Sequence, residues 1–376
     1  MKRIITMIFL ISIIILSYCG KNPNKENGER TENVRIDEQK IANVHFTLTK
    51  RLDALPIGYP KIAVSEYQDK LIVYGLSTKK EEGSDLVARM YNKNLELINE
   101  KTFHHGQGPG DASAFNVFSF SQSNILMCEN SNCRVSIFDN NWNLIDIKKH
   151  KTNMDSFQIY ENGTFFLHGF FHWDDKWDYY SFELGSIPSF KTKTFFTFGS
   201  FKLDDGKKVI LGELTEFSWL YKDKEIFVLD CGNYRILKFD NSGRKLKDIK
   251  FIVKKIKTDH SQDHDSFIEN EMQQFTKRYR FSDTVDPAVA SMIPLSKGFI
   301  VIRRPNYLTD CNGMVDGDYF SYDLKYMGKV KVPCFNSVFR LHTGRRNESF
   351  KYNNGYLYLV LGQEDSDWIE KWEVHE

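Results

Sequence analysis

Short apolar runs separated by polar turns fill most of the chain, and this pattern predicts β-strands joined in hairpins. The run Ile226–Leu229 is apolar at every position, as expected for a strand that is covered on both faces. Three turns between such runs carry Asn and Gly, which suits tight hairpins because Gly tolerates a positive φ. They are residues 161–163, 241–243 and 353–355. We therefore expect an all-β fold in which consecutive strands pair with each other.

A repeat makes this prediction sharper. Residues 129–139 and 230–240 share one pattern: an acidic residue, a short polar stretch, Arg, apolar positions and a final Phe-Asp. The shared pattern reads as strand, turn and strand. Weaker copies give six units, which begin near residues 70, 124, 157, 225, 298 and 355. Units of about 50 residues that cannot bury their apolar faces alone predict a six-bladed β-propeller with four-stranded antiparallel blades.

Residues 261–280 depart from the β-pattern. Apolar residues, among them Phe267, Met272 and Phe275, stand between charged residues at close to helical spacing, and Ser261 can cap the start of a helix. We expect a short helical insertion over 261–280. Insertions in propellers map to loops on one face, which is often the binding face.

The first residues have the form of an export signal. A basic start, Met1–Arg3, precedes the apolar stretch 4–16, which fits a signal peptide and is too short for a comfortable membrane span. Leu16–Gly20 resembles the lipobox of bacterial lipoproteins, in which the cysteine, here Cys19, is lipidated; Tyr18 departs from the small residue expected before it. The alternatives are a plain secretory signal with an incidental cysteine, and a short anchor helix.

The chain therefore divides into three parts. Residues 1–18 are expected to be a lipoprotein signal peptide, residues 19–42 a flexible tether, and residues 43–376 the propeller domain. The stretch after Cys19 is polar and charged, and it holds too few large apolar residues to fold by itself. We expect a protein of the bacterial cell envelope, held to a membrane by its lipid and either periplasmic or surface-exposed.

The repeats resemble a known family. Residues 230–243 look like an NHL-type propeller repeat, with Asp, small residues, Asn, Arg, an aliphatic residue, Phe-Asp and Gly in order. The copy at 129–142 keeps Arg134 but has Trp142 where Gly is expected. The loop 106–111, Gly-Gln-Gly-Pro-Gly-Asp, is similar to a loop of bacterial six-bladed, TolB-like propeller lipoproteins. The resemblance implies a surface-tethered six-bladed propeller and gives no catalytic residue.

The same glycine-rich loop invites comparison with phosphate-binding loops. It lacks the Gly-x-Gly-x-x-Gly spacing and no helix pattern follows it, so a crossover between blades is the better interpretation. Cys128 and Cys133 flank a turn of the repeat and can face each other across a hairpin. In an oxidising compartment they can form a disulfide, and two separate thiols are the alternative.

Four residues are candidates for binding a ligand. Arg134 and Arg235 begin equivalent strands, where a guanidinium can reach an anion in the central channel or bond to nearby carbonyls and acids. Trp173 and Trp177 stand among acidic residues in an apparent loop. If exposed, they can stack on a sugar or anchor a protein; otherwise they cover a blade edge.

We expect a non-catalytic binding or scaffolding module with neither cofactor nor metal, whose partner is an unknown protein, peptide or glycan. The net charge of +1 argues against nucleic acid. One alternative is a metal-assisted hydrolase or lyase, in which histidines and aspartates converge on the channel. The histidines in question are His104, His105, His168, His172, His260 and His264. The other alternative is a carbohydrate-binding surface protein that uses the two tryptophans.

Overall fold

The computed structural model describes the chain from Thr31 to Glu376 with gaps. The residues that it does not describe are 1–30, 66–67, 79–84, 107, 113–115, 130–133, 150–153, 160–163, 170–171, 174–177, 187–188, 190, 199–201, 205–206, 211–216, 231–233, 253–278, 282–288, 304–313, 334–349 and 364–365. The described residues contain strands and turns and no helix, so they contain no helix that could cross a membrane.

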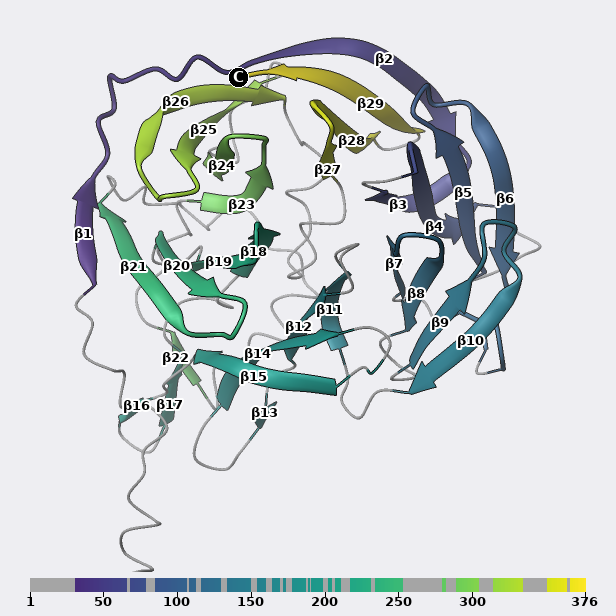
Figure 1. Ribbon diagram of the computed structural model, residues 1–376, viewed down its shortest axis with the longest axis horizontal. Coiled ribbons are helices and arrows are strands. Elements are labelled where there is room, and N and C mark those ends of the chain that lie inside the picture. Colours follow the sequence, from purple (N-terminus) through teal and green to yellow (C-terminus); the bar gives the residue numbers. More distant parts are fainter. Residues whose placement is uncertain are drawn as a thin grey trace, which may run out of the picture.

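Antiparallel sheets surround a central axis, which is the architecture of a β-propeller (Figure 1). Five of them, the blades, are each built from one continuous stretch whose strands pair in chain order. The first three are β3 (Ile57–Val64), β4 (Lys70–Ser77), β5 (Leu86–Asn92) and β6 (Leu97–Phe103); β7 (Asn116–Phe120), β8 (Ile125–Glu129), β9 (Arg134–Phe138) and β10 (Leu144–Lys149); and β11 (Met154–Ile159), β12 (Thr164–Gly169), β14 (Asp178–Ser186) and β15 (Lys191–Phe198), with β13 (His172–Trp173) beside β14. The next two are β18 (Phe217–Lys222), β19 (Glu225–Asp230), β20 (Arg235–Asp240) and β21 (Lys245–Ile252); and β23 (Val289–Pro294), β24 (Gly298–Arg303), β25 (Met314–Ser321) and β26 (Tyr326–Pro333).

One further sheet, the closing sheet, is made from both ends of the chain. Its strands are β27 (Phe350–Asn353), β28 (Tyr356–Gln363), β29 (Ser366–His375) and β2 (His45–Leu55). β2 pairs antiparallel with β29 as the outer strand. The predicted six-bladed propeller is therefore corrected to five self-contained blades. The sixth unit, predicted near residue 355, corresponds to β28 and β29 and takes its outer strand, β2, from the other end of the domain.

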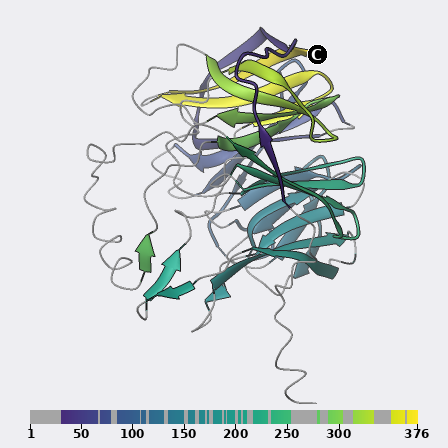
Figure 2. The same ribbon diagram turned by 90° about the vertical axis from the view of Figure 1, so that its left-hand side faces the viewer.

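A small three-stranded sheet stands beyond one face of the ring (Figure 2). β16 (Lys202–Asp204) pairs antiparallel with β17 (Lys207–Ile210), and β17 pairs parallel with β22 (Tyr279–Phe281). β22 corrects the sequence prediction of a helical insertion over 261–280: the end of that segment is a strand, because β17 offers it a partner. The remainder, 261–278, lies outside the described residues.

Residues 31–42, the N-terminal strap, run across the outer edges of two blades. β1 (Glu32–Arg35) pairs parallel with β21, and Ala42 N donates to Lys329 O of β26 at 2.8 Å. Ile36 is buried in the core between these blades. The flexible tether predicted for residues 19–42 is therefore wrong over 31–42, because strand edges supply hydrogen bonds and a core that the segment's own composition lacks.

Charged side chains fasten the strap. Arg303 Nη1 donates to Glu38 at 3.0 Å, and Lys329 pairs with the same carboxylate. Arg303 also donates two bonds of 2.7 Å to Asp318, which is fully buried and accepts a 2.6 Å bond from Tyr234. Burial acts to raise the pKa of Glu38, but the bonds from Lys329 and Arg303 outweigh it and lower that pKa. The buried charges here are thus all paired.

Apolar side chains fill the spaces between adjacent sheets. Between the first two blades, Phe103, Phe118 and Phe138 surround Trp142 with ring centroids 5.7 to 6.3 Å apart. Other clusters lie between the fourth and fifth blades and on both sides of the closing sheet. Since each cluster takes residues from two sheets, no sheet buries its apolar faces without its neighbours.

The turns between the third and fourth strands follow one design. Asp139 Oδ1 accepts bonds from the backbone N of Asn141 at 2.8 Å and of Asn143 at 2.9 Å, and Asp240 does the same in its own turn. The residue that follows the turn has a positive φ in four blades: Leu95 57°, Trp142 64°, Gly243 82° and Leu324 63°. A turn followed by such a residue adds a bulge and matches the twist of the hairpin.

The positive φ of residue 142 explains why Gly is expected at this position, and Trp142 occupies it for a different reason. Trp142 buries its indole in the core at the expense of a strained backbone. At Gly243, an added Cβ would lie 2.1 Å from Phe195 Cβ. A side chain on residue 243 would therefore occupy space that Phe195 of the third blade already fills.

The two faces of the ring differ in their connections. On one, the turn face, the first strand joins the second and the third joins the fourth through short turns, such as 223–224, 241–244 and 354–355. On the other, the loop face, the second strand joins the third and each sheet joins the next. The connections there include 199–216, 253–288, 304–313 and 334–349. All of the longest connections thus emerge on the same side as the small sheet β16–β17–β22.

Candidate functional site

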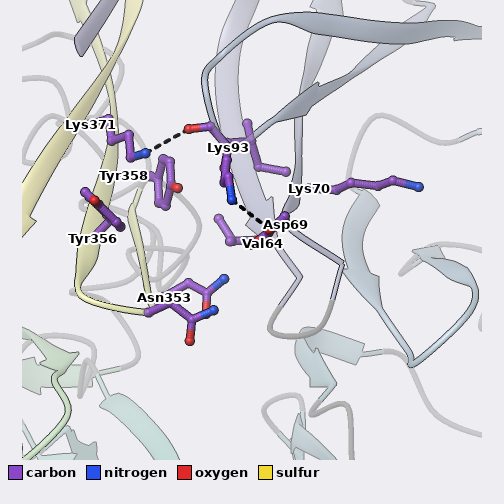
Figure 3. A pocket seen from close by; sticks show the side chains of 10 residues that line it. Val64, Asp69, Lys70, Lys93, Asn353, Tyr356, Tyr358 and Lys371 are labelled. Atoms are coloured by element: carbon purple, nitrogen blue, oxygen red, sulfur yellow. Dashed lines mark hydrogen bonds and ion pairs between the residues drawn. The ribbon is translucent and has the colours of Figure 1, made fainter. Parts of the chain in front are cut away.

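A cavity of about 170 Å³, the seam cavity, lies between the first blade and the closing sheet (Figure 3). It is lined by Val64, Asp69, Lys70, Leu71 and Lys93 on one side and by Asn353, Asn354, Tyr356, Tyr358 and Lys371 on the other. Several of these belong to turns of the turn face. The two walls come from opposite ends of the chain and meet because the ring closes.

The turn between β27 and β28 shapes one wall. Asn354 and Gly355 have φ values of 47° and 80°, the pattern of a tight hairpin that Asn and Gly favour. Asn353 reaches across the seam and donates to Ser65 O at 2.6 Å. The Asn-Asn-Gly turn predicted at 353–355 is thus confirmed, and it holds the closing sheet against the first blade.

Lys371 projects into the seam from β29. It is 8% exposed, and its Nζ donates to Lys93 O at 2.8 Å. The same nitrogen lies 3.9 Å from the ring centroid of Tyr356 and 5.7 Å from that of Tyr358. An ammonium group has three donors, and the described residues give this one a single hydrogen-bond acceptor and two ring faces. Lys371 therefore keeps hydrogen-bonding capacity for a further acceptor.

Positive charge dominates around Lys371. Lys93 Nζ pairs with Asp69 at 3.1 Å, and Asp69 is the acid in the lining. Burial lowers the pKa of Lys371, and the charges of Lys93 and Lys50 lower it further, while Asp69 and Glu373 offset only part of this effect. Lys70 also lines the cavity but points its ammonium away (Figure 3).

Tyr358 completes the aromatic side of the cavity and is 4% exposed. Burial raises its pKa to about 12, so the hydroxyl stays protonated and can donate a hydrogen bond near neutral pH. The arrangement joins ammonium, amide and phenol groups in one small space. Such groups can bind and orient a polar ligand, and none of them forms a pair of nucleophile and base.

The structure gives Arg134 a role within the protein. Its Nε donates to Glu129 at 2.7 Å, and its Nη2 donates to Gly108 O at 2.8 Å and to Asp111 O at 3.1 Å. Glu129 is fully buried, and Ser136 Oγ donates to it at 2.8 Å. Arg134 thus fixes a crossover to its blade, as the structural alternative predicts.

The crossover in question is the glycine-rich loop 106–111, which joins β6 to β7. Gly108 N donates to Asp111 Oδ2 at 2.8 Å. A Cβ added at Gly106 or Gly108 would lie 2.4 or 2.6 Å from the same carboxylate oxygen. A side chain at either glycine would have to displace the Asp111 carboxylate, which folds back into the loop. The connection between blades that the spacing favours is confirmed.

Arg235 also serves the fold. It donates to both carboxylate oxygens of Asp248 in β21, at 2.7 and 2.5 Å. Thr31 of the N-terminal strap donates to Asp248 at 3.3 Å, so the pair also holds the first described residue. Burial acts to raise the pKa of Asp248, but the bonds from Arg235 outweigh it and lower that pKa.

The other predicted residues are only partly described. Cys19, Cys133 and Trp177 lie outside the described residues, and Trp173 lies in β13, where the backbone alone is described. Cys128 is fully buried in β8. The disulfide between Cys128 and Cys133 stays a prediction.

The histidines are spread over several elements. His104 Nδ1 lies 2.8 Å from Asp85 Oδ2, and the backbone N of His105 donates to the same carboxylate. His168 and His172 lie in β12 and β13, and the two at 260 and 264 are outside the described part of the chain. Within that part, no three His, Cys, Asp or Glu side chains gather as a metal site would require.

Reasoning from the sequence missed the seam cavity. Lys371, Tyr356 and Tyr358 alternate along two strands, and alternation alone reads as an ordinary half-buried hairpin. Their partners Asp69 and Lys93 precede them by almost the whole domain. The Asn-Asn-Gly turn at 353–355 was the available signal, but it predicted a hairpin and not a cavity.

Comparison with known proteins supports the fold. The structure is similar to that of a DUF4221 family member from Bacteroides vulgatus, with 13% identity, coverage of 89% of this chain and 99% of the other, and a TM-score of 0.54. It is also similar to that of a protein from Bacteroides fragilis, named as a candidate exported protein, with 10% identity, coverage of 92% and 99%, and a TM-score of 0.51. No family model and no curated protein matches the chain. These similarities establish a shared fold.

Proposed function

We propose that this chain is a lipid-anchored protein of the bacterial envelope whose propeller is a non-catalytic binding module, with the ligand received on the loop face. The closing sheet is counted here as a sixth blade, in line with the resemblance to six-bladed propeller lipoproteins. The observation that carries the proposal is the contrast between the two faces. Binding residues are commonly carried by long connections whose ends are held by a rigid scaffold, and the longest connections of this ring all start and end on the loop face.

The direction of the N-terminal strap agrees with this arrangement. β21 starts at the turn face and β1 runs parallel to it, with Glu32 opposite Ile249 and Arg35 opposite Ile252. The chain therefore comes to β1 from the turn-face side. From Cys19 to Thr31 an extended chain spans at most about 40 Å. A lipid at Cys19 would keep the turn face near the membrane and direct the loop face away from it.

Lipid anchoring is tested by Cys19→Ala in the native host. We expect the variant to lose labelling by an alkyne-bearing fatty acid and to move from the membrane fraction to the soluble fraction. Tyr18→Ala, which restores the small residue usual before the cysteine, is the matched control and should keep both properties. Membrane retention of unlabelled Cys19→Ala would count against the lipid anchor. The structurally similar protein from Bacteroides fragilis is described as a candidate exported protein, and this description accords with the proposed export of this chain.

The ligand face is tested by photo-crosslinking in cells. Benzoyl-phenylalanine at Ile252 and Met314, at the loop-face ends of their strands, is compared with the same probe at Ile98 and Met327, at the turn-face ends. The pairs are matched in exposure, at 51% for Ile252 and 51% for Ile98, and 37% for Met314 and 36% for Met327. We expect defined adducts from the loop-face positions alone. Adducts from the turn-face positions alone would reverse the proposal.

A further inference from the structure

We infer that the seam cavity is a binding site for a small anion that carries a phosphate group. This goes beyond the ligand of the loop face, because the cavity lies at the turn face, between the first blade and the closing sheet. The inference does not depend on lipid anchoring. It rests on the volume of the cavity, on its cations and on their unused donors.

Volume limits the ligand first. A cavity of about 170 Å³ is below the usual range for drug-sized ligands, roughly 300 to 1,000 Å³. It suits a compact polar group and is too small to enclose a whole peptide or oligosaccharide. The mixed lining of amides, tyrosines and lysines favours hydrogen bonding over apolar contact.

The lysines around the cavity indicate that its ligand is negatively charged. Lys371 and Lys93 lie in the cavity opposite one acid, Asp69, and Lys50 adds positive charge from nearby. Lys371 Nζ donates to Lys93 O and faces two tyrosine rings, which leaves a donor with no acceptor among the described residues. Desolvating a cation beside other cations is unfavourable unless an anion compensates it. An anion bound here would supply that compensation.

Charge and acceptor number favour phosphate over a carboxylate. Every cation of the lining is a lysine, and a phosphate monoester offers these ammonium groups up to about two negative charges and three terminal oxygens, whereas a carboxylate offers one charge and two oxygens. Ammonium groups act as point charges with rotatable donors and match a tetrahedral phosphate from several directions. Asn353 and Asn354 add amide groups at the rim. A phosphate with a small polar substituent, such as a phospholipid headgroup, fits this chemistry.

The test uses the full chain in a non-ionic detergent and isothermal titration calorimetry. The probes are inorganic phosphate, sn-glycerol 3-phosphate and dihexanoyl phosphatidylglycerol, with dihexanoyl phosphatidylcholine as the zwitterionic control. We expect saturable binding of glycerol phosphate. Lys371→Met keeps the length of the side chain without its charge, and it should weaken binding about tenfold through the loss of a charged hydrogen bond. Lys149→Met, an exposed change of the same charge on β10, should leave binding unchanged.

Asp69→Asn should change the affinity for the anion in the opposite direction from Lys371→Met. Asp69 has a φ of 45°, which Asn tolerates, so the turn should be kept. Removing this acid releases Lys93 and should tighten anion binding a few-fold. This variant also keeps the test decisive if Lys371→Met does not fold. A fold defect would weaken binding in both variants, whereas the proposed site requires opposite effects.

The lipid and the free phosphate are told apart by their affinities. Tighter binding of phosphatidylglycerol than of glycerol phosphate would identify a membrane lipid as the ligand. Equal binding would support the same site with a soluble phosphate compound. The inference is overturned if no phosphate-bearing anion binds saturably, if Lys371→Met binds as the parent does, or if Asp69→Asn weakens binding.

Discussion

The repeats at residues 129–142 and 230–243 form the same hairpin but give their equivalent residues different partners. Arg134 pairs with buried Glu129 and holds the glycine-rich crossover, whereas Arg235 pairs with Asp248 and holds the start of the N-terminal strap. Trp142 fills its own pocket, whereas Gly243 leaves that space to Phe195. The repeat determines the backbone, and the segment that passes beside each blade determines what a side chain does.

The largest effect is expected from Trp142→Ala. It removes the indole at the centre of the cluster between the first two blades and should lower the free energy of unfolding by about 3–5 kcal/mol. Urea denaturation followed by circular dichroism measures the loss. Leu95→Ala, at the equivalent turn of the first blade, loses a smaller buried side chain and should have a smaller effect. Equal losses would mean that the indole is not the main contribution.

Arg134→Met should destabilise the protein by about 3 kcal/mol, because it leaves Glu129 buried without its cation. The double variant Arg134→Met with Glu129→Gln removes that charge and should recover part of the loss in the same assay. Full additivity of the two changes would contradict the ion pair as the cause.

Gly243→Ala should cost about 2 kcal/mol, since a Cβ there meets Phe195 and the backbone has a positive φ. Gly355→Ala is the matched control: its φ is 80°, and an added Cβ has no atom within 4 Å. The difference between the two variants measures the steric part. Combining Gly243→Ala with Phe195→Ala should reduce that part, and no coupling between them would show that Phe195 is not the obstacle.

The smallest effect is expected from Arg235→Met, at about 1–2 kcal/mol, because Lys245 remains 3.6 Å from Asp248. Asp248 has a lowered pKa in the folded state, so its stabilisation is complete above the ordinary value of 3.8 and is lost as the pH falls below it. The variant should lose part of this acid sensitivity. Hydrogen exchange should also rise in β1. Unchanged hydrogen exchange in β1 would show that the Arg235–Asp248 pair does not hold the N-terminal strap.

The sequence predicted the class of fold and the outer hairpins, because their chemistry is local. Phe239-Asp240 followed by Gly243 marks a turn wherever it occurs, and Asp139 and Asn92 mark two more. The inner strands were mostly missed: β23 and β27 follow long connections, and the Asn-Asn-Gly turn at 353–355 marked the end of β27 but not the strand itself. Asp223 and Lys224 also form a tight turn with positive φ, although neither is Asn or Gly.

The seam cavity was harder to predict because its residues are ordinary in their own strands. Lys371 is one of many lysines, and it becomes distinctive only beside Lys93 and above Tyr356. The strap was missed for a similar reason. Residues 31–42 are too polar to fold alone, and their order comes from β21 and β26. Contacts between distant segments, which no local pattern contains, decide both features.

The closing sheet has a consequence for the order of assembly. Thr49 Oγ1 donates to Lys371 O across 322 positions of sequence, so the ring cannot be completed until residue 371 has been synthesised. Until then β2 and the first blade each lack a neighbour, and such long-range pairing is slow to form. Deleting β29 would therefore do more than remove its 10 residues. It would leave the ring open with two unpaired ends, and chaperones and proteases act on such open structures.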